Sequence, residues 1–387
     1  MRIAMMVRAY IPVPRPTEMI YAPIDLASEI ATGLAKRGHQ VDFYAPSGSH
    51  VKGANIVDRN LRPIAPTLEA FREMIEDPAQ MTHYAPALWD AYMVNDMFKK
   101  ARAGLYDVLH FHHPESALPM AQVNKSVPVV YTLHDPAQPW IRELYELYQT
   151  DNQHYISISN NQRRDAPDLP YLATVYDGIN PKDYPFSAKH DGYLLYAGRI
   201  VPEKGVREAI NVAKQTGHRL LIVGPVYPDS QGYFDQYIKP ELNDQILYLG
   251  YLERDKMPVY YQKAKAVLTP VQWEEPFGLT TIEALASGAP VISFRRGAAP
   301  EIIEDGKSGF IVDTTAEMIE AVKRVNSINR EDCRARVKSK FSVNKMVAGY
   351  EAAFEEAVRQ GRPLPRLLRR TGLQKVPKTI KRVTSKN

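Results

Sequence analysis

The sequence predicts an α/β protein of two domains, each built on a parallel sheet. The first observation is that short apolar stretches alternate with amphipathic ones, the pattern of strands and helices in βαβ units. Strand–helix–strand units are expected in both halves, at 2–7, 24–37 and 41–44, and again at 267–271, 279–287 and 290–294. The second observation is length, because 387 residues suffice for two ordinary domains.

The remaining elements continue the same alternation. Further strands are expected at 107–112, 127–134, 155–159, 192–198, 219–224, 246–252 and 308–312, and helices over much of 50–100, from 159, at 298–304, from 315 and at 342–359. In open parallel sheets, ligands bind outside the carboxyl ends of the strands. The residues that directly follow each strand are therefore the first candidates for function.

The charge of the chain is divided between a body and a tail. The net charge is +5, and residues 361–387 contain nine Lys or Arg and no acid, so 5 − 9 leaves −4 for residues 1–360. A mildly acidic body offers no face that would follow a nucleic-acid backbone. The single cysteine, Cys333, excludes an internal disulfide framework. With neither a leader nor a membrane-spanning pattern in the sequence, we expect a cytoplasmic protein.

The stretch 273–301 carries two carboxylates on a strand-to-helix crossing. Gly278 allows a tight turn, and the N–H groups at the start of the following helix form a site for an anion such as a diphosphate. The flanking Glu275 and Glu283 would repel phosphate and suit the hydroxyls of sugars instead. The alternative is that both are solvated acids at a helix N-terminus, where acids are favoured.

Two cations and four histidines also follow strands. Arg199 and Lys204 come after the strand at 192–198, where they suit a diphosphate, although Lys204 could instead pair with Glu203 on the surface. The histidines are His110, His112, His113 and His134. A metal site is not expected there, because no cysteine and no clear acidic ligand completes a set.

These motifs together resemble those of one enzyme family. The run E-P-F-G-L-T-T-I-E-A-L-A-S-G-A-P-V-I at 275–292 resembles the E-x7-E signature of retaining glycosyltransferases of family 4, which have the GT-B fold. G-R-x-x-x-E-K-G at 198–205 and D-V-x-H-x-H at 107–112 are similar to other motifs of that family, and D-G-I-N at 177–180 resembles its N-G-I-D.

The resemblance implies a domain organisation. Two Rossmann-like domains would face each other across a cleft, with an acceptor-binding domain at 1–183 and a nucleotide-sugar-binding domain at 184–341. A helix at 342–360 would return to the first domain, and a basic tail would occupy 361–387. Within the tail, Leu364, Leu367 and Leu368 beside Arg366, Arg369 and Arg370 could touch an anionic membrane, or the tail could simply be solvated.

The resemblance also implies roles for single residues. Arg199 and Lys204 would hold the diphosphate, Glu283 the ribose and Glu275 the transferred sugar, while His112 would lie at the reacting carbon and His134 and Asp135 would border the cleft. The other donor-binding positions implied are Val223, Gly224, Tyr251, Leu252, Phe277, Gly278, Leu279 and Thr280. The catalytic group would then be His112, Glu275, Arg199 and Lys204.

The reaction implied is transfer of a hexose from a nucleoside diphosphate sugar, commonly UDP-linked, to the hydroxyl of a small molecule, a glycan or a lipid-linked acceptor. No cofactor and no metal is expected, and the sequence contains no D-x-D metal motif.

The first loop, PVPRPTEMIYAP, lacks the paired glycines usual in the family, so it would not contact phosphate through its backbone; Arg15 could supply charge there. The alternatives are a sugar-nucleotide epimerase and a catalytically silent sugar-nucleotide-binding protein.

Overall fold

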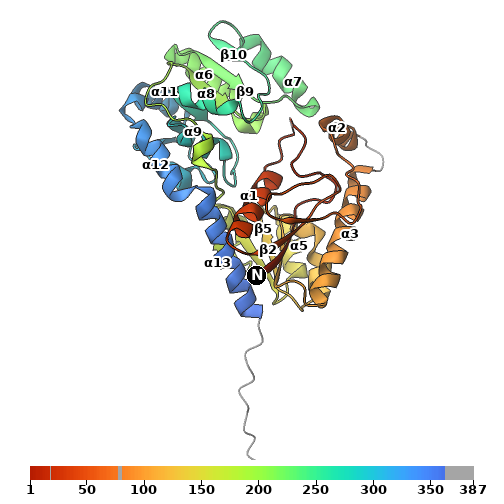
Figure 1. Ribbon diagram of the computed structural model, residues 1–387. Helices are drawn as coiled ribbons and strands as arrows, with labels where there is room; N and C mark the ends of the chain where they lie inside the picture. The colour runs from red at the N-terminus through yellow and green to blue at the C-terminus, as the bar shows by residue number, and fades with distance from the viewer. Residues whose placement is uncertain (18, 77–80, 362–387) are drawn as a thin grey trace, which may run out of the picture.

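The computed structural model describes residues 1–17, 19–76 and 81–361, without the side chains of 75–76 and 81–84. It contains two parallel sheets in separate lobes (Figure 1). The order in the first is β3-β2-β1-β4-β5-β6-β7 and in the second β10-β9-β8-β11-β12-β13. The α/β class and the pair of Rossmann-like domains are therefore confirmed.

The strands are short and mostly buried. Their bounds are β1 Arg2–Met6, β2 Gln40–Tyr44, β3 Asn55–Val57, β4 Val108–Phe111, β5 Val129–Thr132, β6 Gln153–Ser157, β7 Tyr171–Thr174, β8 Leu194–Ala197, β9 Leu220–Val223, β10 Ile246–Tyr248, β11 Ala266–Thr269, β12 Val291–Phe294 and β13 Gly309–Val312. Central strands such as β4 and β12 are buried throughout, as expected when helices cover both faces of a parallel sheet.

The helices fill the connections between strands. Their bounds are α1 Ala22–Lys36, α2 Leu68–Glu76, α3 Met81–Arg102, α4 Leu118–Val123, α5 Pro139–Tyr148, α6 Val206–Thr216, α7 Gln231–Tyr233, α8 Met257–Lys263, α9 Leu279–Ala286, α10 Ala299–Ile302, α11 Thr315–Arg324, α12 Arg330–Lys340 and α13 Val343–Gly361. In β1, Ile3 and Met5 face the α1 and α13 side, while Ala4 and Met6 face the α3 side. This alternation is the two-residue period of a strand.

Several sequence predictions were wrong in extent. Strand β3 interrupts the stretch expected to be helical at 50–100, and the helix expected from 159 is only a 3-10 turn at Gln162–Asp165. Strand β10 ends at Tyr248, short of the predicted 252. The sequence analysis placed no helix at α5 or at α12. Helix α12 is too polar to show a clear apolar stripe, whereas α5 has one at Ile141, Leu144, Tyr145 and Tyr148 that was overlooked.

The C-terminal helix α13 returns to the first domain, which confirms that prediction. It begins after Phe341, whose carbonyl accepts from the N–H of Ile179 at 3.0 Å, and then packs along α1 (Figure 1). Tyr350 and Phe354 of α13 are fully buried in the first-domain core. A Cβ atom at Gly33 of α1 would lie 2.4 Å from Val347, so this small residue lets the two helices approach closely.

Asp177 lies where the chain leaves the first sheet. Its side chain is 3% exposed, and its Oδ1 atom is buried without a hydrogen-bond partner among the described residues. Burial without a charge partner raises the pKa of this carboxyl to about 8. Asp177 therefore carries a proton at neutral pH.

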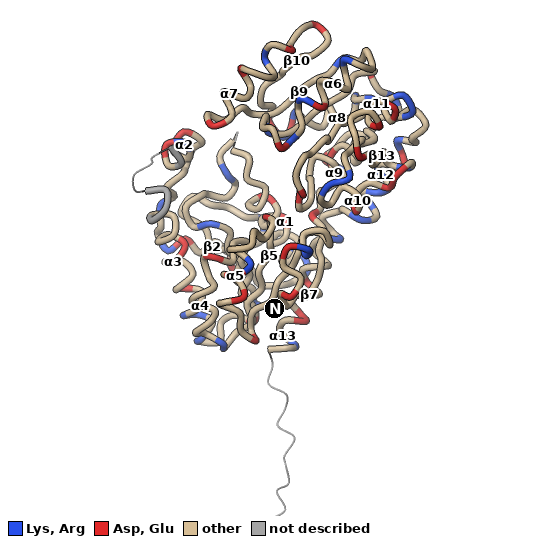
Figure 2. The backbone as a smooth tube through the Cα atoms, turned by 180° about the vertical axis from the view of Figure 1, so that it is seen from behind, with Lys and Arg blue, Asp and Glu red and all other residues tan. Residues whose placement is uncertain are grey.

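Charged residues of both signs are interspersed over both lobes (Figure 2). In the described part of the chain, no helix is long and apolar enough to span a bilayer. The residues of the basic tail from 362 onward, including the leucines and arginines singled out for membrane contact, lie outside the described residues.

Replacing Phe354 with Ala should destabilise the first domain, although position 354 lies far from it in sequence. Removing a fully buried phenylalanine costs about 3–5 kcal/mol of unfolding free energy through lost burial and a cavity. Urea unfolding followed by circular dichroism measures the loss. The exposed neighbour Glu355 is the control, since Glu355→Ala should stay within about 0.5 kcal/mol of the wild type. A loss below about 1 kcal/mol for Phe354→Ala would mean that α13 contributes little to this core.

Replacing Asp177 with Asn should flatten the dependence of stability on pH. Between about pH 4 and 8 the folded state holds a proton on Asp177 that the unfolded state has released, so wild-type stability falls as pH rises through this range. The slope attributable to one proton is about 1 kcal/mol per pH unit, and the Asn variant lacks it. Urea unfolding at a series of pH values gives both slopes. Parallel slopes for the two proteins would contradict the assignment.

Candidate active site

A cleft of about 580 Å³ lies between the carboxyl ends of the two sheets. The predicted site residues that line it are Arg199, Lys204, Val223, Gly224, Tyr251, Leu252, Glu275, Phe277, Gly278, Leu279 and Thr280. Two others, His112 and Glu283, lie behind the lining, in contact with His134 and Tyr261, which do face the cleft. The predicted residues thus gather on one hollow, from loops that follow different strands.

The second-domain wall carries the cations. Arg199 lies two residues beyond the end of β8, and no carboxylate of the described residues lies within ion-pair distance of its guanidinium. Lys204 ends a 3-10 turn at Pro202–Lys204, and its Nζ atom donates to Oε1 of Glu275 at 2.7 Å. The same Nζ atom lies 5.2 Å from the ring centroid of Trp273. The surface pairing of Lys204 with Glu203, an alternative left open by the sequence, is therefore wrong.

The loop that bears Glu275 is fixed by the loop after β12. The N–H of Ala298 donates to the carbonyl of Glu275 at 2.9 Å, and the N–H of Gly297 donates to Oε2 of Glu274 at 2.9 Å. Gly297 has a φ of +53°, and a Cβ atom there would lie 2.1 Å from the carbonyl oxygen of Glu275. Only glycine allows this approach, which sets the position of the Glu275 carboxylate.

Helix α9 begins at the cleft. Its N-cap, Gly278, has a φ of +111°, and the first residues Leu279 and Thr280 line the cleft. N–H groups in the first turn of a helix have no partner within the helix and carry partial positive charge. Phe277, just before the turn, is 5% exposed and packs against Tyr176 and Phe341, so it anchors the turn in the core.

Glu283 lies one turn further along α9 and is already satisfied by the protein. The hydroxyls of Tyr184 and Tyr261 each donate to its carboxylate at 3.0 Å. Burial raises the pKa of Glu283, and the nearby Arg254 opposes that shift. For Glu283 to bind a ribose, as the sequence predicts, a ligand would have to compete with these two tyrosines.

The far end of the cleft is formed by the ends of β8 and β9. Gly224 has a φ of +152°, and a Cβ atom there would lie 1.7 Å from the carbonyl oxygen of Gly198. This close approach requires glycine. The N–H of Gly224 donates to the carbonyl of Gly250 at 2.9 Å, and its carbonyl accepts from the hydroxyl of Tyr248 at 2.8 Å. Tyr251 and Leu252, expected at the end of a strand, instead lie in the loop after β10.

The histidines form a stack behind the first-domain wall. His112 is 1% exposed, and its Nδ1 atom lies 2.8 Å from Nε2 of His134. Burial lowers the pKa of His134 to about 4 and that of His112 well below its usual value, so both rings are neutral at neutral pH. Among the described residues, no three His, Cys, Asp or Glu side chains are grouped to hold a metal ion.

Sequence reasoning named His113 only as one of four histidines near strand ends and missed its partner on the first-domain wall, Tyr21. Tyr21 and His113 line the cleft, and their side chains are hydrogen-bonded to each other. Tyr21 belongs to the glycine-free loop, and His113 follows the D-V-x-H-x-H motif by one position. The double histidine at 112–113 was the only available signal, because 92 residues separate Tyr21 from His113.

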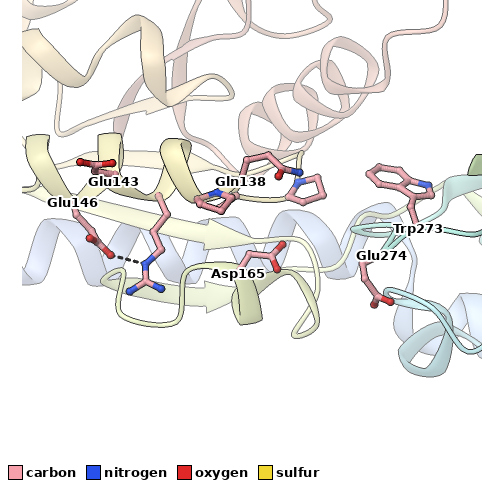
Figure 3. A pocket seen from close by; sticks show the side chains of 10 residues that line it. Gln138, Glu143, Glu146, Asp165, Trp273 and Glu274 are labelled. Carbon is pink, nitrogen blue, oxygen red and sulfur yellow. Dashed lines mark hydrogen bonds and ion pairs between the residues drawn. The ribbon is translucent and has the colours of Figure 1, made fainter.

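A second hollow of about 610 Å³ adjoins the cleft (Figure 3). We call it the side groove, and its lining consists of Pro136, Ala137, Gln138, Pro139, Arg142, Glu143, Glu146, Asp165, Trp273 and Glu274. Trp273 lines both hollows. The only cation of this lining, Arg142, is held by Glu146 at 2.6 Å, so the side groove is acidic.

Comparisons with known proteins identify both halves of the chain. A family model described as Glycosyltransferase Family 4 matches residues 25–183, and one described as Glycosyl transferases group 1 matches residues 182–340. A lipopolysaccharide 1,2-N-acetylglucosaminetransferase of Salmonella typhimurium is 29% identical over 180 residues, which is 41% of this chain and 46% of that enzyme. The N-acetyl-alpha-D-glucosaminyl L-malate synthase of Bacillus anthracis is 23% identical over 86% of this chain and 93% of its own.

Solved structures resemble the whole fold. Sucrose-phosphate synthase from Thermosynechococcus elongatus has a TM-score of 0.69 at 16% identity, covering 92% of this chain and 99% of that one. The Anabaena protein HepE in complex with UDP has a TM-score of 0.69 at 17% identity, covering 92% and 100%. The two family models meet at residues 182–183 and together run from 25 to 340, and the chain therefore belongs to glycosyltransferase family 4 and has the GT-B fold.

Proposed function

We propose that the protein is a retaining, metal-independent hexosyltransferase that moves a sugar from a UDP-sugar to an acceptor hydroxyl. The observation that carries the proposal is the convergence of Arg199, Lys204 and the start of α9 on one wall of the cleft. Two cations and a set of free amides suit a diphosphate, and a carboxylate, Glu275, lies beside them.

The protein groups of this wall would neutralise the leaving group. The ammonium of Lys204 has three N–H bonds, of which one is used by Glu275, so the others remain for phosphate oxygens. Arg199 adds a planar set of donors that form no ion pair with a carboxylate of the described residues, and the α9 amides add partial positive charge. The absence of D-x-D from the sequence supports charge neutralisation by the protein alone.

The remaining contacts follow from position. Glu275 would accept hydrogen bonds from hydroxyls of the transferred sugar, and Glu283 from the ribose. The uracil would lie against Val223, Gly224, Tyr251 and Leu252 at the other end of the cleft. His112 would act at the reacting carbon from beneath His134, whose ring stacks on it with centroids 5.1 Å apart.

The proposed chemistry needs no protein nucleophile. The bond between the anomeric carbon and the phosphate oxygen breaks, and its electron pair stays on the diphosphate. The acceptor oxygen then bonds to the same face of the anomeric carbon, and its proton passes to a phosphate oxygen. Preorganised positive charge on the leaving group favours this path, because negative charge develops there in the transition state.

Two observations keep alternatives open for testing. Carboxyl groups of both domains, those of Asp177 and Glu275, line the cleft, and an epimerase would need acids on both sides for proton transfer. The glycine-free first loop would suit a protein that binds a nucleotide sugar without turning it over.

Replacing Lys204 with Ala should reduce turnover about 10²–10³-fold, the usual effect of removing one stabilising group from a developing oxyanion. The rate of UDP release from UDP-glucose measures the effect, and circular dichroism checks that the fold is intact. Lys214→Ala is the matched control, because this exposed lysine pairs with Glu241 on the surface. A near-normal rate for Lys204→Ala would show that Lys204 does not hold the leaving group.

Incubating the protein with UDP-glucose and EDTA should give slow release of UDP together with the α-anomer of glucose, because water replaces the acceptor in a retaining reaction. Proton NMR distinguishes the anomers before they equilibrate. The β-anomer would contradict retention, and a rate restored only by Mn²⁺ would contradict metal independence. A C2 epimer would favour the epimerase, and binding of UDP-glucose without any turnover would favour the silent protein.

A further inference from the structure

The two walls of the cleft differ in charge. All lysines and arginines that line it, Arg199, Lys204 and Arg296, belong to the second domain. The first-domain wall consists of Ile20, Tyr21, Ala22, Pro23, Leu26, His113, His134, Asp135, Ile158 and Asp177. Within the part of the chain that the structure describes, this wall therefore holds no permanent cation.

The first-domain cation that contacts this wall through His113 is neutralised. Arg8 donates to Oδ2 of Asp90 at 2.8 Å, and the other oxygen of Asp90, which is 1% exposed, accepts from the N–H of Ala9 at 2.7 Å. A second guanidinium nitrogen of Arg8 lies 3.0 Å from Nδ1 of His113. The charge of Arg8 is thus paired with a buried acid, and one of its nitrogens contacts the imidazole of His113 on the wall.

The contact with Arg8 fixes the direction of the next hydrogen bonds. A guanidinium only donates, so Nδ1 of His113 must accept. Burial lowers the pKa of His113 well below its usual value, and the neutral ring then carries its proton on Nε2. This N–H donates to the oxygen of Tyr21. Burial raises the pKa of Tyr21, so the phenol keeps its own proton and can donate it towards the cleft.

The acids around this wall would repel an anion. The carboxylate of Asp135 is exposed at the wall, with only acceptor oxygens to offer when ionised. The side groove opens beyond Trp273, and four of its residues are acids: Glu143, Glu146, Asp165 and Glu274 (Figure 3). Hydroxyl groups satisfy such acceptors, whereas a phosphate or carboxylate would face like charge.

We propose that the acceptor of this enzyme is a hydroxyl-rich compound without a phosphate or carboxylate group, and that the hydroxyl of Tyr21 donates a hydrogen bond to one of its oxygens. This proposal rests on the proposed transferase function. It follows from the division of the cleft: the cations of the second domain serve the diphosphate, and the first domain offers neutral donors and acidic acceptors.

Matched acceptor pairs test the substrate class with the wild-type protein. UDP release from UDP-glucose is measured with glucose or glucose 6-phosphate, with myo-inositol or an inositol monophosphate, and with glycerol or glycerol 3-phosphate. At least one neutral member should accelerate release about tenfold more than its phosphorylated partner. Faster release with a phosphorylated member, or acceleration by no neutral member, overturns the proposal. UDP release without acceptor is tested first, so failure of the transferase function itself is recognised separately.

Tyr21→Phe tests the hydrogen bond, because it removes only the hydroxyl and keeps the ring that stacks on His113. The KM for the neutral acceptor should rise about tenfold. The Kd for UDP should rise by a factor several times smaller. Tyr92→Phe, at an exposed position of α3, is the matched control and should change neither constant. Equal changes in the acceptor KM and the UDP Kd overturn the role of Tyr21. Thermal unfolding checks both variants, and the acceptor pairs keep the proposal testable should Tyr21→Phe fail to fold.

Discussion

Glu301 of α10 reaches from the second domain to the first. Its carboxylate accepts hydrogen bonds from the backbone N–H and the side-chain amide of Asn160, from the backbone N–H of Asn161 and from the hydroxyl of Tyr176, at 2.7–3.0 Å. Together with the return of α13, this contact holds the carboxyl ends of the two sheets face to face. Each sheet alone would offer half a site. Because the carboxyl ends of the two sheets face each other, they form one cleft, and groups from both domains can act on the same bound molecules.

Within that cleft the two domains contribute different chemistry. Lys204 and Glu275 form an ion pair beside the cleft, with side chains that are 15% and 24% exposed. The second domain thereby presents charge, as an anionic leaving group requires. The first domain presents groups that burial keeps neutral, such as Asp177, His134 and Tyr21. The first-domain wall has no lysine or arginine among the described residues, and it also carries the exposed acid Asp135. A cleft with cations on one wall only can orient a molecule that is anionic at one end only.

Sequence patterns predicted the elements that are identified by residues close together in the chain. The unit β11–α9–β12 was predictable because apolar runs, Gly278 and Gly288 follow one another along the chain. The position of Arg199 and Lys204 after a strand was predictable in the same way. The partners of Glu283 were not predictable, since Tyr184 lies 99 residues away and only folding brings its hydroxyl to the carboxylate. The same holds for the short strand β3, which is recognisable as a strand only through its pairing with β2.

The first loop explains why the phosphate site would fall on one domain. Its residues Ile11, Val13 and Met19 are buried in the first-domain core, and its Arg15 pairs with Asp25 of α1 at 3.0 Å. The loop is thus tied to its own domain by apolar burial and by an ion pair, and Arg15 is already engaged by Asp25. Arg254 of the second domain reaches the same Asp25 at 3.2 Å. The loop therefore packs behind Tyr21, and under the proposed function Arg199, Lys204 and the start of α9 would neutralise the leaving group.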